Sequence, residues 1–293
     1  MAGSFESFPS GTIYVHDFGG AGDPIVAVHG LGGAHLNWLP VADRLSRTGH
    51  LIAPDLPGFG YSPPGRAYTV RSHAHVITEV IERLSRPATL IGNSLGGLVV
   101  IRAAHDRPDL VKRMVLVAPA GPPRLDDQRL DSMVARRLVL QGLPIAGPLM
   151  INRYWKATSP AVQLRDTLAV VCSHPERIPA EVLARSLELA AARRKQPWAV
   201  EALVRSGRSA GAMLAARQRF RVTLKEITVP TLIIQGAEDR IIPGSGVEWI
   251  AGVRPDWTLE VMEDCGHCPQ LEAPVRFTDI VERWTESLQL AAG

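Results

Sequence analysis

The feature that most constrains the fold is the pattern G-x-S-x-G at residues 92–96. It stands between the apolar run 88–91, typical of a buried strand, and the helix-like segment 98–104. In this context the pattern is typical of a nucleophile elbow, a sharp strand-to-helix turn with strained dihedral angles. Gly92 and Gly96 suit such a turn because they bring no side chain into it. We therefore predict that the hydroxyl of Ser94 stands clear of its backbone as a candidate nucleophile.

A serine hydroxyl is inert at its own pKa and needs a neighbouring base. Asp239 follows the strand-like run 229–235, and His267 follows the strand-like run 257–262. Because ligands bind at the carboxyl ends of strands in open α/β sheets, we expect both side chains near Ser94. His267 would take the proton from Ser94 and return it to the leaving group, while Asp239 would fix the imidazole tautomer and stabilise the imidazolium.

A glycine-rich loop at 30–33 follows the buried-strand run 24–28. Such a loop lets the backbone approach a substrate oxygen, so we predict that the N–H groups of Leu31 and Leu95 bind the oxyanion. Four further residues near these loops are candidates for contact with the substrate. They are Gly30, His35, Trp38 and Ile241.

With these residues in order, the chain resembles the serine-nucleophile branch of the α/β-hydrolase family. Residues 55–62 (D-L-P-G-F-G-Y-S) are similar to that family's D-x-P-G-x-G-x-S loop, and residues 266–274 are similar to its G-H-x-P-x-x-E-x-P segment. The resemblance covers about residues 12–120 and 228–290. It implies the fold and the triad, and it does not single out one enzyme.

The alternation of apolar runs and amphipathic segments predicts an α/β fold with a mostly parallel central sheet covered by helices on both faces. Strands are expected at 12–18, 25–29, 51–54, 88–92, 113–118, 230–235 and 257–262. Helices are expected at 37–47, 69–85, 95–107 and 274–289.

The pattern changes between residues 122 and 225, where the sequence becomes rich in helix-forming residues. We predict that this segment is a helical cap inserted between core segments 1–121 and 226–293. It holds 18 lysines and arginines against 8 acidic residues, a net charge of +10. A basic cap attracts anionic substrates, but arginine also suits solvated helix faces, so both interpretations stay open. The apolar residues Leu138, Leu140, Leu143, Ile145 and Leu149 are candidates either for an acyl pocket or for packing against the core.

Composition narrows the protein class. A chain of 293 residues that is 46% hydrophobic can bury one large core with an insertion, and no apolar stretch reaches membrane-spanning length. The first residues lack the features of a signal peptide, and three cysteines fit a reducing compartment. We expect a cytoplasmic protein that binds a small-molecule substrate, with no cofactor, no metal, no nucleic acid and no stable membrane insertion.

The pattern C-G-H-C at 265–268 also occurs in disulfide-exchange enzymes. That chemistry needs a thioredoxin-like βαβ unit with the first cysteine at a helix start, and a zinc site needs a second pair of ligands. The hydrolase-like segment around His267 accounts for the pattern without either. A disulfide between Cys265 and Cys268 remains a hypothesis beside that of two inert, buried thiols.

The serine at position 94 limits the reactions that the family resemblance allows. The resemblance implies that epoxide hydrolases and haloalkane dehalogenases use an aspartate at this position, so Ser94 argues against both activities. Serine suits acyl transfer, so our first hypothesis is hydrolysis of a carboxylic ester with a small or medium acyl group through an acyl-enzyme. The alternative is carbon–carbon bond hydrolysis of a vinylogous diketo acid from aromatic ring cleavage, since G-N-S-x-G-G is similar to that group and a cap arginine would hold the carboxylate. A ligand-binding protein without turnover is the third hypothesis.

Overall fold

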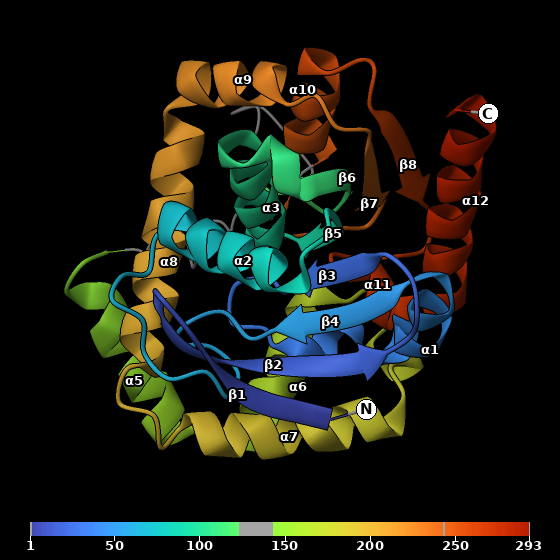
Figure 1. Ribbon diagram of the computed structural model, residues 1–293. Coiled ribbons are helices and arrows are strands. Elements are labelled where there is room, and N and C mark those ends of the chain that lie inside the picture. The colour runs from blue at the N-terminus through green and yellow to red at the C-terminus, as the bar shows by residue number, and fades with distance from the viewer. Residues whose placement is uncertain (1, 123–142, 243, 293) are drawn as a thin grey trace.

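The computed structural model describes residues 2–122, 143–242 and 244–292 (Figure 1). Within these ranges eight strands form one sheet in the order β1-β2-β4-β3-β5-β6-β7-β8. The strands are β1 (Ala2–Phe8), β2 (Gly11–Gly19), β3 (Pro24–Val28), β4 (His50–Pro54), β5 (Ala88–Asn93), β6 (Val111–Val117), β7 (Thr231–Gly236) and β8 (Thr258–Met262).

The sheet is mostly parallel, as the sequence predicts. β1 pairs with β2 and β2 with β4 in antiparallel fashion, and every later pair from β4 to β8 is parallel. The central strands β3, β5 and β7 carry buried or nearly buried residues throughout, which explains their continuous apolar runs. Their carboxyl ends meet at one edge, where the loops with the candidate residues begin.

Helices cover both faces of the sheet (Figure 1). Helices α2 (Val70–Leu84), α3 (Leu95–Asp106) and α10 (Gly244–Val253) pack on one face, and α1 (Leu39–Thr48) and α12 (Pro274–Ala292) pack together on the other. Short helices complete the core: η1 (His35–Trp38), η2 (Pro108–Leu110) and α11 (Pro269–Glu272). Each face buries its own apolar cluster, so the sheet is a rigid platform for the loops at its edge.

Between β6 and β7 the chain forms a further group of helices. They are α5 (Ala146–Ala157), α6 (Pro160–Val171), η3 (Pro175–Arg177), α7 (Ala180–Arg193), α8 (Ala199–Ala215) and α9 (Arg217–Glu226). They fall in the segment expected to be the cap, while residues 123–142, with Leu138 and Leu140, lie outside the described residues. The division of the chain at 121 and 225 therefore stays a prediction. Among the described residues, no helix has the length and hydrophobicity needed to cross a bilayer.

The sequence analysis did not predict the edge strand β1 or the helix α10. Strand β1 forms a hairpin with β2, pairing Ala2 with Asp17 through to Phe8 with Gly11. Its side chains are mostly exposed, and Phe5 is 63% exposed although it is aromatic. Because an edge strand buries little, it leaves no apolar pattern to recognise.

Candidate active site

The turn at Ser94 has the geometry of a nucleophile elbow. Ser94 has φ 55° and ψ −113°, a region that a residue with a side chain seldom adopts, and its N–H donates to the Val117 carbonyl at 2.9 Å. A Cβ atom on Gly92 would lie 2.4 Å from the Gly96 carbonyl oxygen, and one on Gly96 would lie 2.2 Å from the Val28 carbonyl oxygen. Both glycines are therefore required by close backbone contact between strand and helix.

Asp239 and His267 meet at the neighbouring strand ends, after β7 and β8. The Asp239 Oδ2 atom lies 2.7 Å from His267 Nδ1, and both side chains are buried. The same Oδ2 accepts the Gln235 amide at 3.1 Å, while Oδ1 accepts the N–H groups of Ile241 at 2.8 Å and Ile242 at 2.9 Å. Four donors thus fix the carboxylate, and the carboxylate fixes the imidazole plane.

Two other acids lie close to Asp239 or His267 in the sequence, and neither contacts His267. Asp264 is exposed, and its carboxylate contacts Arg177 at 2.7 Å and His174 at 2.6 Å instead of His267. Glu238 is exposed beside Asp239, and its carboxylate lies near His174 and Asp264. Of these three acids, Asp239 is therefore the one that contacts His267.

Asn93 connects the elbow to the histidine loop. Its Nδ2 donates to the carbonyl of Val117 at 3.1 Å and to the carbonyl of His267 at 3.2 Å. Within the described part of the chain, Ser94 Oγ makes no hydrogen bond to His267. Catalytic hydrogen bonds are commonly long in free enzymes and tighten when substrate is bound. Asn93, which the sequence analysis did not single out, connects the His267 loop to the strand end that precedes Ser94.

The glycine loop lies directly against the elbow. A Cβ atom on Gly30 would be 3.3 Å from Ser94 Cβ and 3.2 Å from Asn93 Oδ1, so a side chain there would require its neighbours to shift by a few tenths of an ångström. Leu95 is the first residue of α3, and the first N–H groups of a helix have no acceptor within it. Leu31 follows Gly30 in the same loop and is 36% exposed. The positions of both residues agree with donors for an oxyanion.

Two of the residues predicted to contact the substrate, Trp38 and His35, lie in the protein interior. Trp38 is fully buried in the apolar cluster between the sheet, α1 and α12. His35 is also buried, and both its backbone N–H (2.7 Å) and its ring Nδ1 (3.0 Å) contact Asp55 Oδ1. These placements do not support a contact with substrate, because the side chains serve the core and the buried carboxylate. Ile241 is partly exposed, and its N–H is bound to Asp239.

His29, which directly follows β3, has a structural role. Its Nε2 accepts the N–H of Leu56 at 3.0 Å, and its Nδ1 therefore carries the proton and donates to the Gly30 carbonyl at 2.8 Å. Burial lowers the pKa of His29 to about 4, so the ring is neutral at physiological pH.

The helices between β6 and β7 reach the loops of the candidate site. The N–H of His267 donates to the Val171 carbonyl at 2.9 Å, at the end of α6. Glu272 is buried; its Oε1 accepts the N–H of Gly266 at 3.0 Å and its Oε2 accepts those of Ser173 at 2.8 Å and His174 at 2.9 Å. Glu272 is the glutamate of the hydrolase-like segment 266–274, so the sequence motif includes this residue. The motif did not show that its carboxylate links the two loops.

Arg193 is a further residue whose role the sequence did not reveal. It ends α7, as the neighbouring Gln196 and Pro197 suggest, but its guanidinium turns inward and donates to the Gly32 carbonyl at 2.5 Å. Its Nε and Nη2 atoms are buried without a hydrogen-bond partner among the described residues. Burial lowers the pKa of Arg193 to about 10, so it stays charged at neutral pH. Helix α7 thus places a buried cation beside the glycine loop.

The three cysteines come close together around the histidine loop. Cys172, Cys265 and Cys268 are free and buried, and the Cys268 thiol points to Asn93 Oδ1 at 3.9 Å. Burial raises the pKa of Cys265 to about 12, and contact with Cys172 and burial raise that of Cys268 well above its usual value. Because the thiolate is the reactive form, these thiols are suited to packing rather than to redox chemistry.

Comparison with known proteins gives a consistent picture. Residues 23–274 match the family described as alpha/beta hydrolase fold. The chain is 29% identical over 300 residues to 2-hydroxymuconate semialdehyde hydrolase of Pseudomonas sp. (strain CF600), covering 95% of this chain and 92% of that one. It is 28% identical over 258 residues to pimeloyl-[acyl-carrier protein] methyl ester esterase of Aromatoleum aromaticum, covering 88% and 96%.

Comparison with solved structures finds the same fold. A thermophilic esterase from Thermogutta terrifontis superposes with a TM-score of 0.70 at 21% identity, covering 98% of this chain and 99% of that one. The relatives thus include both an ester hydrolase and a hydrolase named for a semialdehyde substrate.

Proposed function

Because this chain belongs to the α/β-hydrolase family, we propose that it is a serine hydrolase that cleaves a carboxylic ester of a small or medium acyl group. Family membership makes it a hydrolase; the ester, the acyl-enzyme and the triad of Ser94, His267 and Asp239 are the proposal. The observation that carries it is the buried 2.7 Å contact between Asp239 and His267 at the strand ends beside the strained Ser94 elbow.

The geometry suggests the following steps. His267 takes the proton of Ser94 as the serine oxygen attacks the ester carbonyl, and Asp239 stabilises the imidazolium that forms. The N–H groups of Leu31 and Leu95 hold the oxyanion. The tetrahedral intermediate collapses, the alcohol leaves with the proton from His267, and the acyl group stays on Ser94. Water, deprotonated by His267, then attacks the acyl-enzyme and releases the acid and the free serine.

The test is turnover of p-nitrophenyl acetate and p-nitrophenyl butyrate by the purified protein and by Ser94→Ala. We expect the variant to lose roughly 10³-fold or more in kcat, and His267→Ala to lose about as much, with little further loss in the double variant. No turnover of any ester together with no covalent labelling of Ser94 would favour the ligand-binding hypothesis.

Arg193 favours a second candidate, a substrate that carries a carboxylate. A buried charge without a full set of partners is strongly unfavourable, and a carboxylate is the anion that a guanidinium binds bidentately. The two unpartnered nitrogens of Arg193 lie on the side chain that reaches the glycine loop at Gly32. Carbon–carbon hydrolysis of a vinylogous diketo acid fits this cation, and so does a half-ester of a dicarboxylic acid.

Arg193→Met tests this candidate, because methionine keeps the aliphatic stem and removes the charge. We expect KM to rise at least tenfold for a half-ester and to stay nearly constant for the matched neutral ester. An equal change for both substrates would show that Arg193 only supports the glycine loop. Turnover of a vinylogous diketo acid above that of the esters would make carbon–carbon hydrolysis the principal activity.

A further inference from the structure

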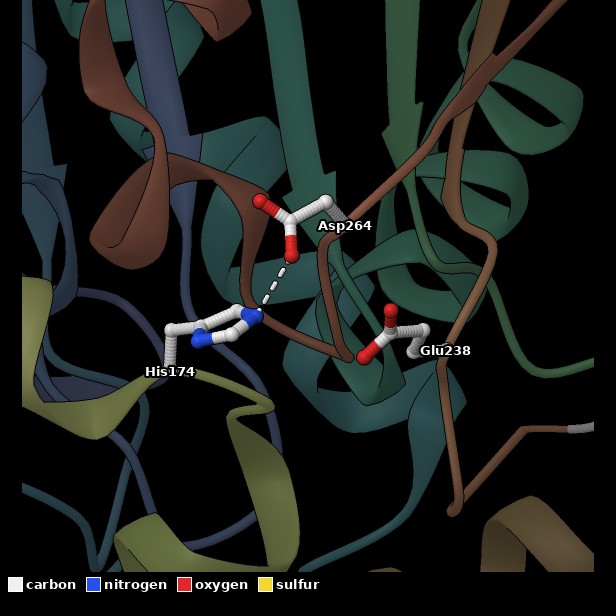
Figure 2. A group of neighbouring side chains, drawn as sticks. All are labelled: His174, Glu238 and Asp264. Atoms are coloured by element: carbon white, nitrogen blue, oxygen red, sulfur yellow. Dashed lines mark ion pairs between the residues drawn. The ribbon is translucent and has the colours of Figure 1, made fainter.

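A second group of polar side chains lies outside the candidate triad, at the junction between the cap and the core. His174 comes from the segment between α6 and η3, Glu238 from the loop after β7, and Asp264 from the loop after β8. Their ligand atoms, one ring nitrogen and two carboxylate oxygens, all lie within 4.8 Å of one another. Figure 2 shows the three side chains converging from these separate segments.

We propose that His174, Glu238 and Asp264 bind a divalent transition-metal ion, with Zn²⁺ as the best match. One imidazole and two carboxylates are ligands that Zn²⁺ takes, and water would complete a tetrahedral set. Donor atoms around tetrahedral Zn²⁺ lie roughly 3.3–3.6 Å apart, given bonds of about 2.0–2.2 Å. His174 Nε2 and Asp264 Oδ1 are now 2.6 Å apart, so small side-chain rotations would admit an ion between them and Glu238.

The surroundings of His174 favour this interpretation. Its other ring nitrogen, Nδ1, lies 3.0 Å from a carboxylate oxygen of Glu176, the arrangement that orients metal-binding imidazoles through their second nitrogen. This contact turns Nε2 toward Asp264. A surface pocket lined by Ser173, Glu238 and Arg240 adjoins the group, so water can reach an ion held there.

A competing arrangement is a plain ion-pair network. Arg177 lies 2.7 Å from Asp264 Oδ2, and it compensates part of the acidic charge without a metal. Glu238, in contrast, makes no ion pair with an arginine or lysine in the described ranges 2–122, 143–242 and 244–292, so the network does not explain its approach. The Glu238 carboxylate is therefore the ligand that distinguishes a metal site from an ion-pair network.

The position of the site suggests a consequence for stability. Glu238 immediately precedes Asp239, and Asp264 lies three residues before His267, while His174 belongs to the cap. An ion shared by the three would join the cap to both loops of the proposed triad. Binding to the folded chain alone would raise the melting temperature with increasing ion concentration. This proposal does not depend on the ester chemistry, because it concerns binding and stability.

The experiment is calorimetric titration of the full-length, chelator-treated protein with ZnCl₂, repeated with Glu238→Gln and His174→Gln. Glu238→Gln is the principal variant, since it leaves the contacts among His174, Asp264 and Arg177 in place. His105→Gln is the matched control: like His174, its ring contacts one carboxylate through each nitrogen, those of Asp106 and Glu226, but it belongs to no group of three candidate ligands among the described residues.

We expect one Zn²⁺ per chain, with affinity at least tenfold weaker in Glu238→Gln and His174→Gln and unchanged in His105→Gln. At the same Zn²⁺ concentration, the melting temperature should rise for the wild type and for His105→Gln, and it should rise less for Glu238→Gln. The proposal is wrong if no saturable binding occurs, or if Glu238→Gln binds Zn²⁺ as tightly as the wild type. In either case the group is an ion-pair network.

Discussion

Replacement of Asp239 by asparagine separates its chemical role from its structural role. The amide keeps one oxygen for the N–H groups of Ile241 and Ile242, which Asp239 Oδ1 binds at 2.8 and 2.9 Å. It places an NH₂ group where Oδ2 now contacts His267 Nδ1. The imidazole must then carry its proton on Nε2, and it can no longer take the proton of Ser94.

The expected loss of kcat is about 10⁴-fold, the size seen for this change in a serine–histidine–aspartate triad. At 1.36 kcal/mol for each factor of ten, the loss corresponds to about 5.4 kcal/mol of activation free energy. The fold should change little. Gln235 Oε1 is buried without a partner, so its amide can rotate to accept the new NH₂ group. We expect the free energy of unfolding to fall by only about 1 kcal/mol.

The assay is kcat on p-nitrophenyl butyrate together with urea unfolding. Glu238→Gln, the adjacent exposed carboxylate, and Asp264→Asn, the rival acid, are the controls and should both stay within a few-fold of the wild type. A loss below tenfold in well-folded Asp239→Asn would refute the reasoning, and so would a larger loss in Asp264→Asn.

Three further predictions follow from the packing. Gly96→Ala should destabilise the protein by about 3 kcal/mol, because the new Cβ would lie 2.2 Å from the Val28 carbonyl oxygen; an unchanged urea midpoint would contradict this close contact. The free energy of unfolding should fall as the pH falls from 6.5 toward 4. Burial lowers the pKa of His29 to about 4 and that of His73 to about 3. In this pH range the unfolded chain therefore binds protons that the folded chain does not. Flat stability over this range in urea titrations would count against it. Diamide should leave ester turnover unchanged, because the Cys268 thiol is buried with a raised pKa; reversible inactivation restored by a thiol would support the disulfide hypothesis.

The core fold was predictable because local signals and topology agree. The apolar runs fix the central strands, and the glycines at 92 and 96 predict the turn that places Ser94 at φ 55°. Since parallel strands end at one edge, the order of the loops sufficed to predict that Asp239 and His267 meet.

The remaining features depend on tertiary contacts between distant segments. Arg193 has the sequence pattern of a solvated helix end, and only the packing of α7 on the glycine loop buries it. Trp38 and His35 stand near the loop in sequence, but the side chains turn into the core and toward Asp55. The group of His174, Glu238 and Asp264 has no ligand spacing along the chain, because it forms only when the segment between α6 and η3 packs against the loops after β7 and β8.

The most direct test of the proposed function is covalent labelling with a fluorophosphonate, followed by digestion and mass spectrometry. Such a probe reacts with a serine that is activated by a base, and an ordinary hydroxyl does not react. We predict one label per chain, on the peptide that contains Ser94, with loss of ester turnover in proportion to labelling and no label in Ser94→Ala or His267→Ala. A label on a different serine, or full turnover after complete labelling of Ser94, would contradict the proposal.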